Sequence, residues 1–365
     1  MHELGDRVGR RAPTMVFAGS FWNGGTERGL ADGFREGGWA VQEIDNRDYR
    51  IGPGHHLSLR IAARLLRNTA EEAYRRRIVD ACRLLKPDIF LTVKGEGVSG
   101  ELLRCIKKAD VRTAMFYPDF HFDHRGVSAD AFAEYDLFIT TKTFQLDYLN
   151  GRRGLKHVAY VPHGYVDAVH RPPFTHVAED RYCTDLLYSG SHTTFKHRWL
   201  EKTIALLPEV SMDIVGPRWH QHKSGSLLRH RTSGAQIGPA YAAAIQRSRI
   251  NLAIHMGPTS SGWEDLVSTR TFEIPACGGF MLHIDNDEVR EFFKPGEEID
   301  VFSTPEELAD KIRFYLARPT LRAQMIERAH ARAVPAYGYR ARSAAVDELL
   351  RAEPLPSGYG VERST

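Results

Sequence analysis

Short apolar runs alternate with amphipathic stretches along most of this chain. The runs are bounded by turn residues, as in Phe280–Ile284 before Asp285, which is typical of buried parallel strands. The stretches between them keep the apolar spacing of helices packed on a sheet. This order predicts an α/β fold with parallel sheets. We expect strands at 14–19, 39–44, 89–93, 111–117, 135–140, 157–162, 185–190, 210–216, 250–255 and 280–284, and helices at 26–34, about 60–85, 100–108, 239–248, 306–316, 319–331 and 337–350. A further helix follows the loop 190–198 and ends near Leu207.

The pattern stops once, in a segment rich in Pro, His and Gly from His163 to about Asp180. It restarts with the apolar run that ends at Gly190. Each half opens with a strand, a glycine-containing loop and a helix, as Rossmann-like domains do. We therefore expect domains at 1–165 and 180–335, followed by a last segment at 336–365.

Composition limits the class of protein. Of the 365 residues, 42% are apolar and 26% are charged, as in a soluble globular protein, and no apolar run approaches the roughly 20 residues of a membrane-spanning helix. The first residues lack the apolar core of a signal peptide. Four scattered cysteines suit reduced core thiols, so we expect a cytoplasmic protein. The net charge of +3 does not indicate nucleic-acid binding.

The stretch from Asp265 to His283 carries the clearest chemical signal. It is typical of a loop with Arg270, a short helix with Glu273 that ends at Gly278-Gly279, and a strand. Backbone N–H groups at a helix N-terminus favour an anion, and a cation with a carboxylate there suits a phosphorylated sugar or a nucleotide. Spacing alone favours the alternative, a surface Arg–Glu pair, which stabilises little.

The run Arg270-Thr-Phe-Glu-Ile-Pro-Ala-Cys-Gly-Gly279 resembles the signature of the CgeB-like (spore maturation protein) glycosyltransferases. These are related to the retaining family-4 glycosyltransferases, which have the GT-B fold. The resemblance implies two Rossmann-like domains facing a central cleft, with a C-terminal helix that crosses back to the first domain. It implies an acceptor-side domain at 1–165 and a nucleotide-sugar-binding domain at 180–335.

The resemblance also assigns residues. Arg270 and Thr271 would contact the donor nucleotide, and Glu273 would hold the ribose hydroxyls. Asp265, eight residues before Glu273, stands where the family-4 enzymes have the first Glu of a Glu-x7-Glu pair that contacts the donor sugar. The implied reaction is metal-independent transfer from a UDP-, GDP- or dTDP-linked sugar, with retention of configuration and without a cofactor. The acceptor stays open between a glycan, a protein, a lipid and a small molecule.

The loop Gly190–Arg198 resembles the family's turn beside the diphosphate. Backbone N–H groups of Gly190 and Ser191, with Lys196 or Arg198, would supply fixed positive potential for a leaving diphosphate. The alternative is that both cations only begin a surface helix. Trp219 in the basic stretch 217–234 would stack on the base.

The polar residues after the strand at 111–117 form a second candidate site, because ligands of α/β sheets bind beyond the carboxyl ends of strands. The resemblance implies that Asp119 or His121 contacts the transferred sugar or the acceptor hydroxyl, since the relatives have a His or Asp at this strand end. The spacing of these polar residues does not fit a metal-binding helix, so we expect no metal.

The arginine-rich segment 57–77 has an apolar helical face, which fits either an ordinary solvated helix or contact with an anionic membrane. Two other functions stay open. A nucleotide-sugar epimerase or hydrolase on the same fold would turn over without an acceptor, and a non-catalytic protein would bind a nucleotide sugar or a glycan without transfer.

Overall fold

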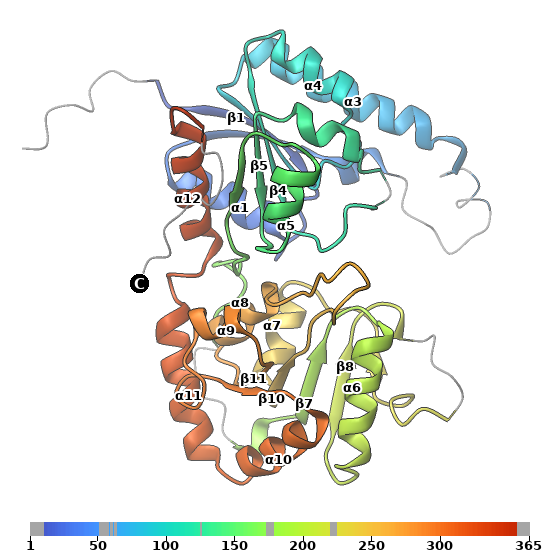
Figure 1. Cartoon of the computed structure of the whole chain (residues 1–365), viewed down its shortest axis with the longest axis vertical. Coiled ribbons are helices and arrows are strands. Elements are labelled where there is room, and N and C mark those ends of the chain that lie inside the picture. Colours follow the sequence, from blue (N-terminus) through green and yellow to red (C-terminus); the bar gives the residue numbers. More distant parts are fainter. Residues whose placement is uncertain are drawn as a thin grey trace, which may run out of the picture. The chain divides into compact units, whose positions relative to one another are not determined.

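The computed structural model describes residues 11–50, 58, 61, 64–124, 126–172, 179–219 and 225–355. By their contacts the residues divide into two units (Figure 1). Unit 1 comprises the described residues of Met1–Phe21, Leu30–Pro162 and Arg342–Thr365, and unit 2 comprises those of Trp22–Gly29 and His163–Ala341. The assignment of an acceptor side and a donor side to the predicted domains stays a prediction.

Unit 1 contains a six-stranded sheet in which every neighbouring pair is parallel. The predicted strands at 14–19 and 89–93 have those bounds. In spatial order the strands are β2 (Ala40–Asp45), β1 (Thr14–Gly19), β3 (Ile89–Val93), β4 (Arg112–Tyr117), β5 (Leu137–Thr140) and β6 (Val158–Tyr160).

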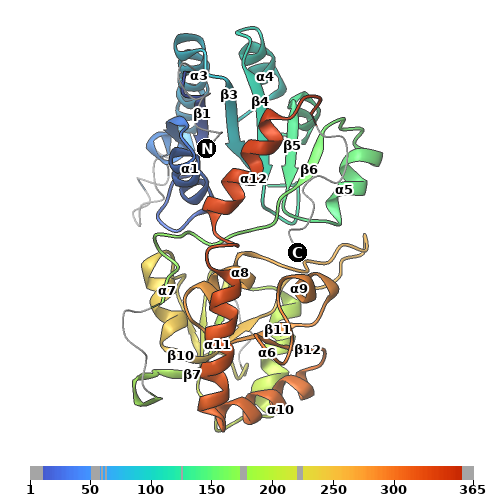
Figure 2. The same cartoon turned by 90° about the vertical axis from the view of Figure 1, so that its left-hand side faces the viewer.

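The helices of unit 1 include α3 (Arg67–Leu85), α4 (Gly100–Lys107) and the short α5 (Gln145–Asp147). Unit 1 also contains the larger parts of α1 (Thr26–Glu36) and α12 (Tyr339–Arg351), whose first residues belong to unit 2. The helix α3 ends at Lys86, whose φ of 43° is left-handed, just before Pro87 as predicted. The last helix returns to unit 1: Ser343 Oγ donates to the Leu30 carbonyl of α1, and Arg112 of β4 donates to the Leu350 carbonyl at 2.8 Å (Figure 2).

Unit 2 contains a second six-stranded sheet, again parallel throughout. Its strands in spatial order are β12 (Asp300–Phe302), β11 (Met281–Ile284), β10 (Ser248–Ala253), β7 (Thr184–Ser189), β8 (Met212–Val215) and β9 (Thr232–Ser233). Its helices include α6 (Thr194–Ala205), α7 (Pro239–Gln246), α8 (Thr269–Ala276), α9 (Asp287–Phe292), α10 (Pro305–Leu316) and α11 (Pro319–Ala333).

The sheet of unit 2 has a hydrophobic core on each face, because successive apolar side chains of its strands point to opposite faces. On β7, Leu186 and Tyr188 join the core that includes Leu200 of α6 and Ile312 of α10. Leu187, between them, joins the opposite core with residues of α7, α8 and α11. Since successive side chains of a strand point to opposite faces, this buries the sheet on both sides. The predicted α/β class with two parallel sheets is therefore confirmed.

Several local expectations were wrong or incomplete. The stretch 217–234, expected as a loop, contains β9, and the sequence pattern missed α9 and β12. Arg270 lies in the first turn of α8 and not in the preceding loop. Cys183 is exposed, whereas Cys82 and Cys277 are buried as expected.

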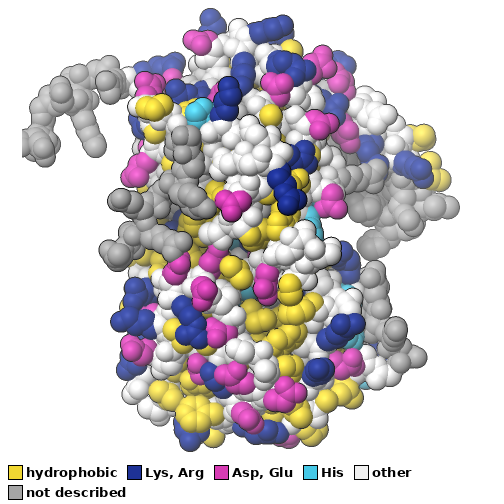
Figure 3. All heavy atoms as spheres, viewed as in Figure 1, with side chains coloured by type: hydrophobic (Ala, Val, Ile, Leu, Met, Phe, Trp, Pro, Cys, Tyr) yellow, Lys and Arg dark blue, Asp and Glu magenta, His cyan; other side chains and the backbone are white. Residues whose placement is uncertain are grey.

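The segment 57–77 lies partly outside the described residues, and its membrane contact stays a prediction. Leu65 is 75% exposed beside the exposed Arg64, at the end of the described part of this segment. On the face drawn in Figure 3, Lys and Arg are interspersed with Asp and Glu over both units. No helix among the described residues has the length and apolar character that crossing a membrane requires.

The two strands at the centre of unit 2 define where a ligand is expected. From β7 the chain moves outward on one side to β8 and β9, and then on the other side to β10, β11 and β12. The gap between β7 and β10 is thus a topological switch point, and ligands of open α/β sheets bind there, beyond the carboxyl ends of the strands.

At this edge, the backbones after β7 and β8 approach closely. The Gly190 N–H donates to the Val215 carbonyl at 2.9 Å, and a Cβ on Gly216 would lie 2.1 Å from the Gly190 oxygen. Gly216 also has a φ of 152°, which residues other than glycine rarely adopt. Glycine is therefore required at position 216 for the turn after β7 to keep its place.

We expect Gly216→Ala to destabilise the protein by about 2–5 kcal/mol, because the new methyl group strains the backbone and displaces the Gly190 carbonyl. The measurement is the midpoint of urea unfolding. Gly234→Ala is the matched control, since no atom lies within 4 Å of its added Cβ. Equal midpoints for the two variants would contradict this close approach.

Candidate functional site

The turn after β7 forms the floor of the candidate site. Gly190 has a φ of 153°, and its carbonyl accepts from the indole N–H of Trp219 at 2.7 Å. The His192 N–H donates to the Pro217 carbonyl at 3.1 Å. These bonds fix the turn against the end of β8, so that its path is set before any ligand binds.

Trp219 lies under this turn. Its ring is 1% exposed, and His192 meets it edge-on at 4.9 Å between ring centroids. A nucleobase needs an exposed face for stacking, and a buried ring offers none. In this structure Trp219 supports the Gly190 turn, and its stacking on a base stays a prediction that requires the ring to become exposed.

Lys196 is a buried cation at the start of α6. Thr193 caps the helix by accepting from the Lys196 N–H, and the Lys196 ammonium donates to the Ser191 carbonyl at 3.4 Å. The side chain is only 5% exposed. Burial, with the positive charges of Arg270 and Arg218, lowers the pKa of Lys196 to about 7, and Asp265 works in the opposite direction. Lys196 is thus held near its point of half-protonation at neutral pH.

Arg198, the other predicted cation of this helix, is exposed. Two residues of separation on a helix turn the side chain by more than half a turn, which takes Arg198 away from the direction of Lys196. Of the two alternatives, the structure brings Lys196 into the site.

Arg270 reaches the same turn from α8. A Cβ on Gly190 would lie 3.0 Å from Arg270 Nη1, so the missing side chain makes room for the guanidinium. Arg270 Nη2 donates to His255 Nδ1 at 3.3 Å. Its Nε is buried and has no hydrogen-bond partner among the described residues. A buried donor without a partner is costly, which points to an acceptor supplied by a ligand.

Asp265 and Glu273 balance these cations. Both carboxylates help to hold the pKa of Arg270 raised against its burial. The Asp265 side chain is 9% exposed, and its backbone N–H donates to the Met256 carbonyl at 3.1 Å. The structure therefore places the predicted Asp265, Lys196 and Arg270 together.

Glu273 lies deeper, with 8% of its surface exposed. Burial raises the pKa of Glu273 to about 7, while Arg270 and hydrogen bonds from Thr269 and Tyr241 work to lower it. His170 Nε2 lies 3.8 Å from Glu273 Oε1. Because His170 Nδ1 accepts from the Val166 N–H, the neutral ring carries its proton on Nε2 and presents it to this carboxylate.

Thr271 is buried with an exposed fraction of 0%. Its hydroxyl accepts from the Ser268 N–H at 3.3 Å and lies 3.0 Å from His283 Nε2. The predicted contact of Thr271 with a nucleotide stays a prediction, and in this structure its hydroxyl is used within the protein. The residue caps α8 and so helps to place Arg270.

In unit 1, Asp119 lies beyond the carboxyl end of β4. Lys94 Nζ, after β3, lies 2.9 Å from Asp119 Oδ2, and His124 Nε2 lies 3.1 Å from it. Gln145 fixes the loop by donating to the Asp119 carbonyl at 2.9 Å. His121 is half-buried, and its carbonyl accepts from the Tyr117 hydroxyl. Asp119 and His121 thus share one loop, with Lys94 as a partner that the sequence pattern did not reveal.

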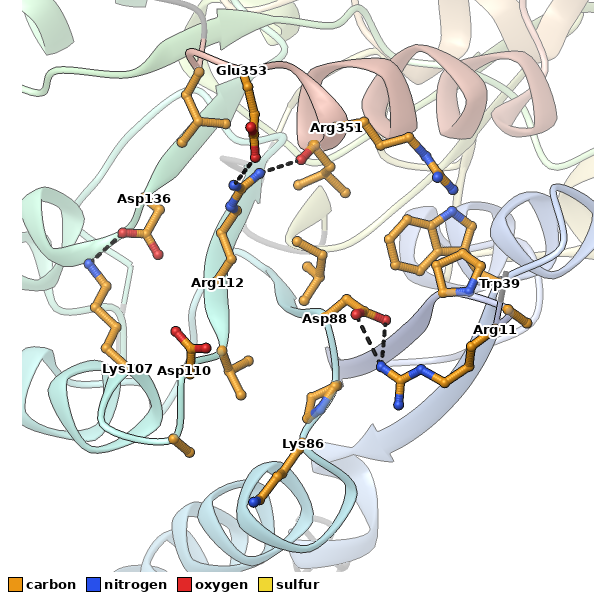
Figure 4. Close-up of a pocket in the computed structure, with 18 of the residues that line it drawn as sticks. Arg11, Trp39, Lys86, Asp88, Lys107, Asp110, Arg112, Asp136, Arg351 and Glu353 are labelled. Carbon is orange, nitrogen blue, oxygen red and sulfur yellow. Dashed lines mark hydrogen bonds and ion pairs between the residues drawn. The ribbon is translucent and has the colours of Figure 1, made fainter. Parts of the chain in front are cut away.

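A hollow of about 1510 Å³ lies at the opposite, amino edge of the same sheet (Figure 4). Charged side chains line it, but they form ion pairs with one another: Arg11 with Asp88 at 3.1 Å, Lys107 with Asp136 at 2.8 Å, and Arg112 with Glu353 at 3.4 Å. These pairs offset the charge that would attract a ligand. The carboxyl edge of unit 2 is the better candidate.

Sequence reasoning missed His170, His255 and His283. His283 stands within an apolar strand and His255 just after another, and that placement is the one signal of a buried polar pair. No group of three or more His, Cys, Asp or Glu side chains in the described part of the chain is arranged to hold a metal ion.

Known proteins resemble this chain in sequence over its second half and in fold over most of its length. Residues 194–350 match the family model described as glycosyl transferase-like. The matched segment starts at the first turn of α6 and therefore contains Lys196, Asp265, Arg270 and Glu273. No curated protein sequence matches the chain.

Solved structures share the fold over almost the whole chain. A glycosyltransferase from Rickettsia africae aligns with a TM-score of 0.64 at 12% identity, covering 94% of this chain and 98% of its own. HepE of Anabaena in complex with UDP-glucose aligns with a TM-score of 0.61 at 14% identity, covering 92% and 99%. Sucrose-phosphate synthase of Thermosynechococcus elongatus aligns with a TM-score of 0.59 at 13% identity, covering 93% and 98%. The predicted GT-B fold is confirmed.

We expect Glu273→Gln to gain stability relative to the wild type as the pH rises. The pKa of Glu273 is raised from 4.5 to about 7, so its contribution to stability is full below about pH 4.5 and lost as the pH rises through about 7. Between the low and the high end of this pH range, the unfolding free energy of the variant relative to the wild type should rise by about 3 kcal/mol for a pKa shift of this size. Urea unfolding of both proteins between about pH 4.5 and 8 measures it. A difference that does not change with pH would show that Glu273 is not buried as described.

Proposed function

We propose that this protein is a glycosyltransferase that moves a sugar from a nucleotide-diphosphate donor to a hydroxyl group of an acceptor. One observation carries the proposal: two buried cations, Lys196 and Arg270, meet a glycine turn at the switch point of the second sheet. They lie in the first turns of α6 and α8. Helix N-termini and cations at a switch point together suit a diphosphate.

The same groups stabilise the leaving group. As the glycosidic bond breaks, negative charge grows on the diphosphate, and donors already in place lower the energy of that charge without reorganising. The Arg270 Nε donor lacks a partner among the described residues, so it is free for a phosphate oxygen. Two cations supply the charge that a divalent metal supplies elsewhere, and we propose metal-independent transfer.

Glu273 and Asp265 complete the donor site in this proposal. Glu273 accepts from the ribose hydroxyls, which gives a buried carboxylate the hydrogen bonds that water would otherwise provide. Asp265 contacts the transferred sugar. The sequence of residues 270–279 supports a place among the CgeB-like enzymes and, by that resemblance, a hexosyl transfer that retains configuration.

Unit 1 binds the acceptor in this proposal. Asp119, paired with Lys94, and His121 contact the sugar or the acceptor hydroxyl from the carboxyl edge of the first sheet. The UDP-glucose in the Anabaena HepE structure supports a UDP-linked donor among the UDP, GDP and dTDP alternatives.

The test is donor binding without added metal. Thermal shifts with UDP-, GDP-, dTDP- and CMP-sugars identify the base, and calorimetry gives the dissociation constant. We expect Glu273→Ala to weaken donor binding by roughly 1–3 kcal/mol, because two ribose hydroxyls lose a buried acceptor. Arg198→Ala, on the exposed side of α6, is the matched control and should bind as the wild type does.

The outcomes separate the alternatives. Turnover of the donor that requires an acceptor supports transfer, whereas turnover without one indicates an epimerase or hydrolase. Donor binding with no turnover under any acceptor indicates a binding protein. If none of the nucleotides binds, the proposal is refuted.

Donor binding should also take up a proton. The pKa of Lys196 is about 7 without a ligand, and a diphosphate beside it would raise that pKa. At about pH 8 we therefore expect close to one proton to be taken up per UDP bound. Calorimetry in buffers of different ionisation enthalpy measures this number. Lys196→Met should abolish the uptake and Glu273→Gln should keep it; a wild type that binds UDP with no uptake would contradict the role of Lys196.

A further inference from the structure

A chain of buried hydrogen bonds runs from Arg270 into the second sheet. Arg270 Nη2 lies 3.3 Å from His255 Nδ1, and His255 Nε2 lies 2.9 Å from His283 Nε2. His283 Nδ1 lies 2.6 Å from the Ile284 carbonyl. His255 and His283 are 1% and 0% exposed, so each polar atom depends on its protein partner.

The far end of the chain fixes its direction. A carbonyl oxygen only accepts, so His283 Nδ1 must carry a hydrogen and donate to Ile284. Burial lowers the pKa of His283 to about 4, which keeps the ring neutral. Its Nε2 is then a bare acceptor, and His255 Nε2 must donate to it. That leaves His255 Nδ1 bare, and it accepts from the Arg270 guanidinium. In each of these hydrogen bonds, therefore, the donor lies on the Arg270 side and the acceptor on the Ile284 side.

The hydroxyl of Thr271 joins the chain at the same atom. It lies 3.0 Å from His283 Nε2 and accepts from the Ser268 N–H, which leaves its own hydrogen for the imidazole. The Thr271 oxygen also lies 3.4 Å from His255 Nε2, so the single lone pair of His283 Nε2 is shared between the His255 N–H at 2.9 Å and the Thr271 hydroxyl at 3.0 Å. The first turn of α8 is therefore connected to His283 of β11 in two ways: directly through the Thr271 hydroxyl, and through the Arg270 guanidinium and His255.

We infer that His255 and His283 are positioning residues that set the orientation of Arg270. An arginine at the edge of a site has many rotamers, and ordering it costs free energy each time a ligand binds. The unprotonated Nδ1 of His255 accepts a hydrogen bond from Arg270 Nη2. The absence of a side chain at Gly190 leaves room for Arg270 Nη1. This leaves Nε, which has no partner in the described part of the chain, for the ligand. The identity of the ligand depends on the proposed function. The direction of the hydrogen bonds from Arg270 to Ile284 does not depend on it.

The direction of these hydrogen bonds predicts the tautomers of His255 and His283, and this can be tested without a ligand. Long-range ¹H–¹⁵N spectra of the histidine side chains at about pH 7 should show His255 protonated on Nε2 and His283 protonated on Nδ1, the tautomer that free histidine favours less. Spectra of His255→Asn and His283→Asn assign the two signals. Either residue in the opposite tautomer, or carrying two protons at this pH, would overturn the inference.

Two variants of His255 test its action on Arg270. The amide oxygen of His255→Asn takes the place of Nδ1 and keeps an acceptor for Arg270, whereas His255→Gln replaces Nε2 and removes it. Both should melt at similar temperatures. With UDP as the probe, we expect His255→Gln to weaken binding about tenfold and His255→Asn to stay within about threefold of the wild type. Equal weakening by both variants would contradict positioning through Nδ1.

A double-mutant cycle separates positioning from packing. In an Arg270→Lys background, His255→Gln should change UDP affinity less than about twofold, because there is no guanidinium left to orient. An undiminished tenfold effect in that background would assign His255 a purely structural role. If the wild type binds none of UDP, GDP and dTDP, the proposed function fails, while the tautomers still decide whether the directed series of hydrogen bonds exists; if it binds GDP or dTDP in place of UDP, the same variants are compared with that nucleotide.

Discussion

The close approach of two backbones, at Gly190 and Gly216, sets the geometry on which the candidate site depends. It requires glycine at both positions, and it leaves a floor with no side chain at the carboxyl ends of β7 and β8. Lys196, Arg270 and the indole of Trp219 all take their places from that floor. A side chain at position 190 would displace the Tyr188 hydroxyl and the guanidinium, since its Cβ would lie 2.8 Å from the Tyr188 oxygen and 3.0 Å from Arg270 Nη1.

Burying two cations side by side is unfavourable, and the site offsets this cost in two ways. Asp265 and Glu273 supply opposite charge, and burial brings Lys196 close to losing its proton. The ligand-free site therefore carries less positive charge than two fully protonated cations would give it. An anion that binds beside Lys196 favours protonation of its amine and so raises the positive charge of the site. In the proposed function, this arrangement favours a diphosphate most strongly at the moment of bond breaking, when the charge on the diphosphate is greatest.

The sequence predicted the order of the main strands and the short helix with Arg270 and Glu273, because these follow from local periodicity and from the Gly278-Gly279 helix end. It did not predict contacts that depend on the packed fold. Trp219 and Thr271 have side chains suited to a ligand, yet packing buries them under the site. His255 and His283 are far apart in the sequence and meet only because β10 and β11 pair. The short strand β12 lacks the length that makes an apolar run stand out.

The most direct measurement is a crystal structure of the protein with UDP. The diphosphate should lie against the Gly190–Ser191 turn, within hydrogen-bond distance of the Lys196 ammonium and of Arg270 Nε, with the ribose hydroxyls on Glu273. A diphosphate bound elsewhere, such as in the hollow at the amino edge of unit 1, with Arg270 Nε still without a partner, would contradict the assignment of this site.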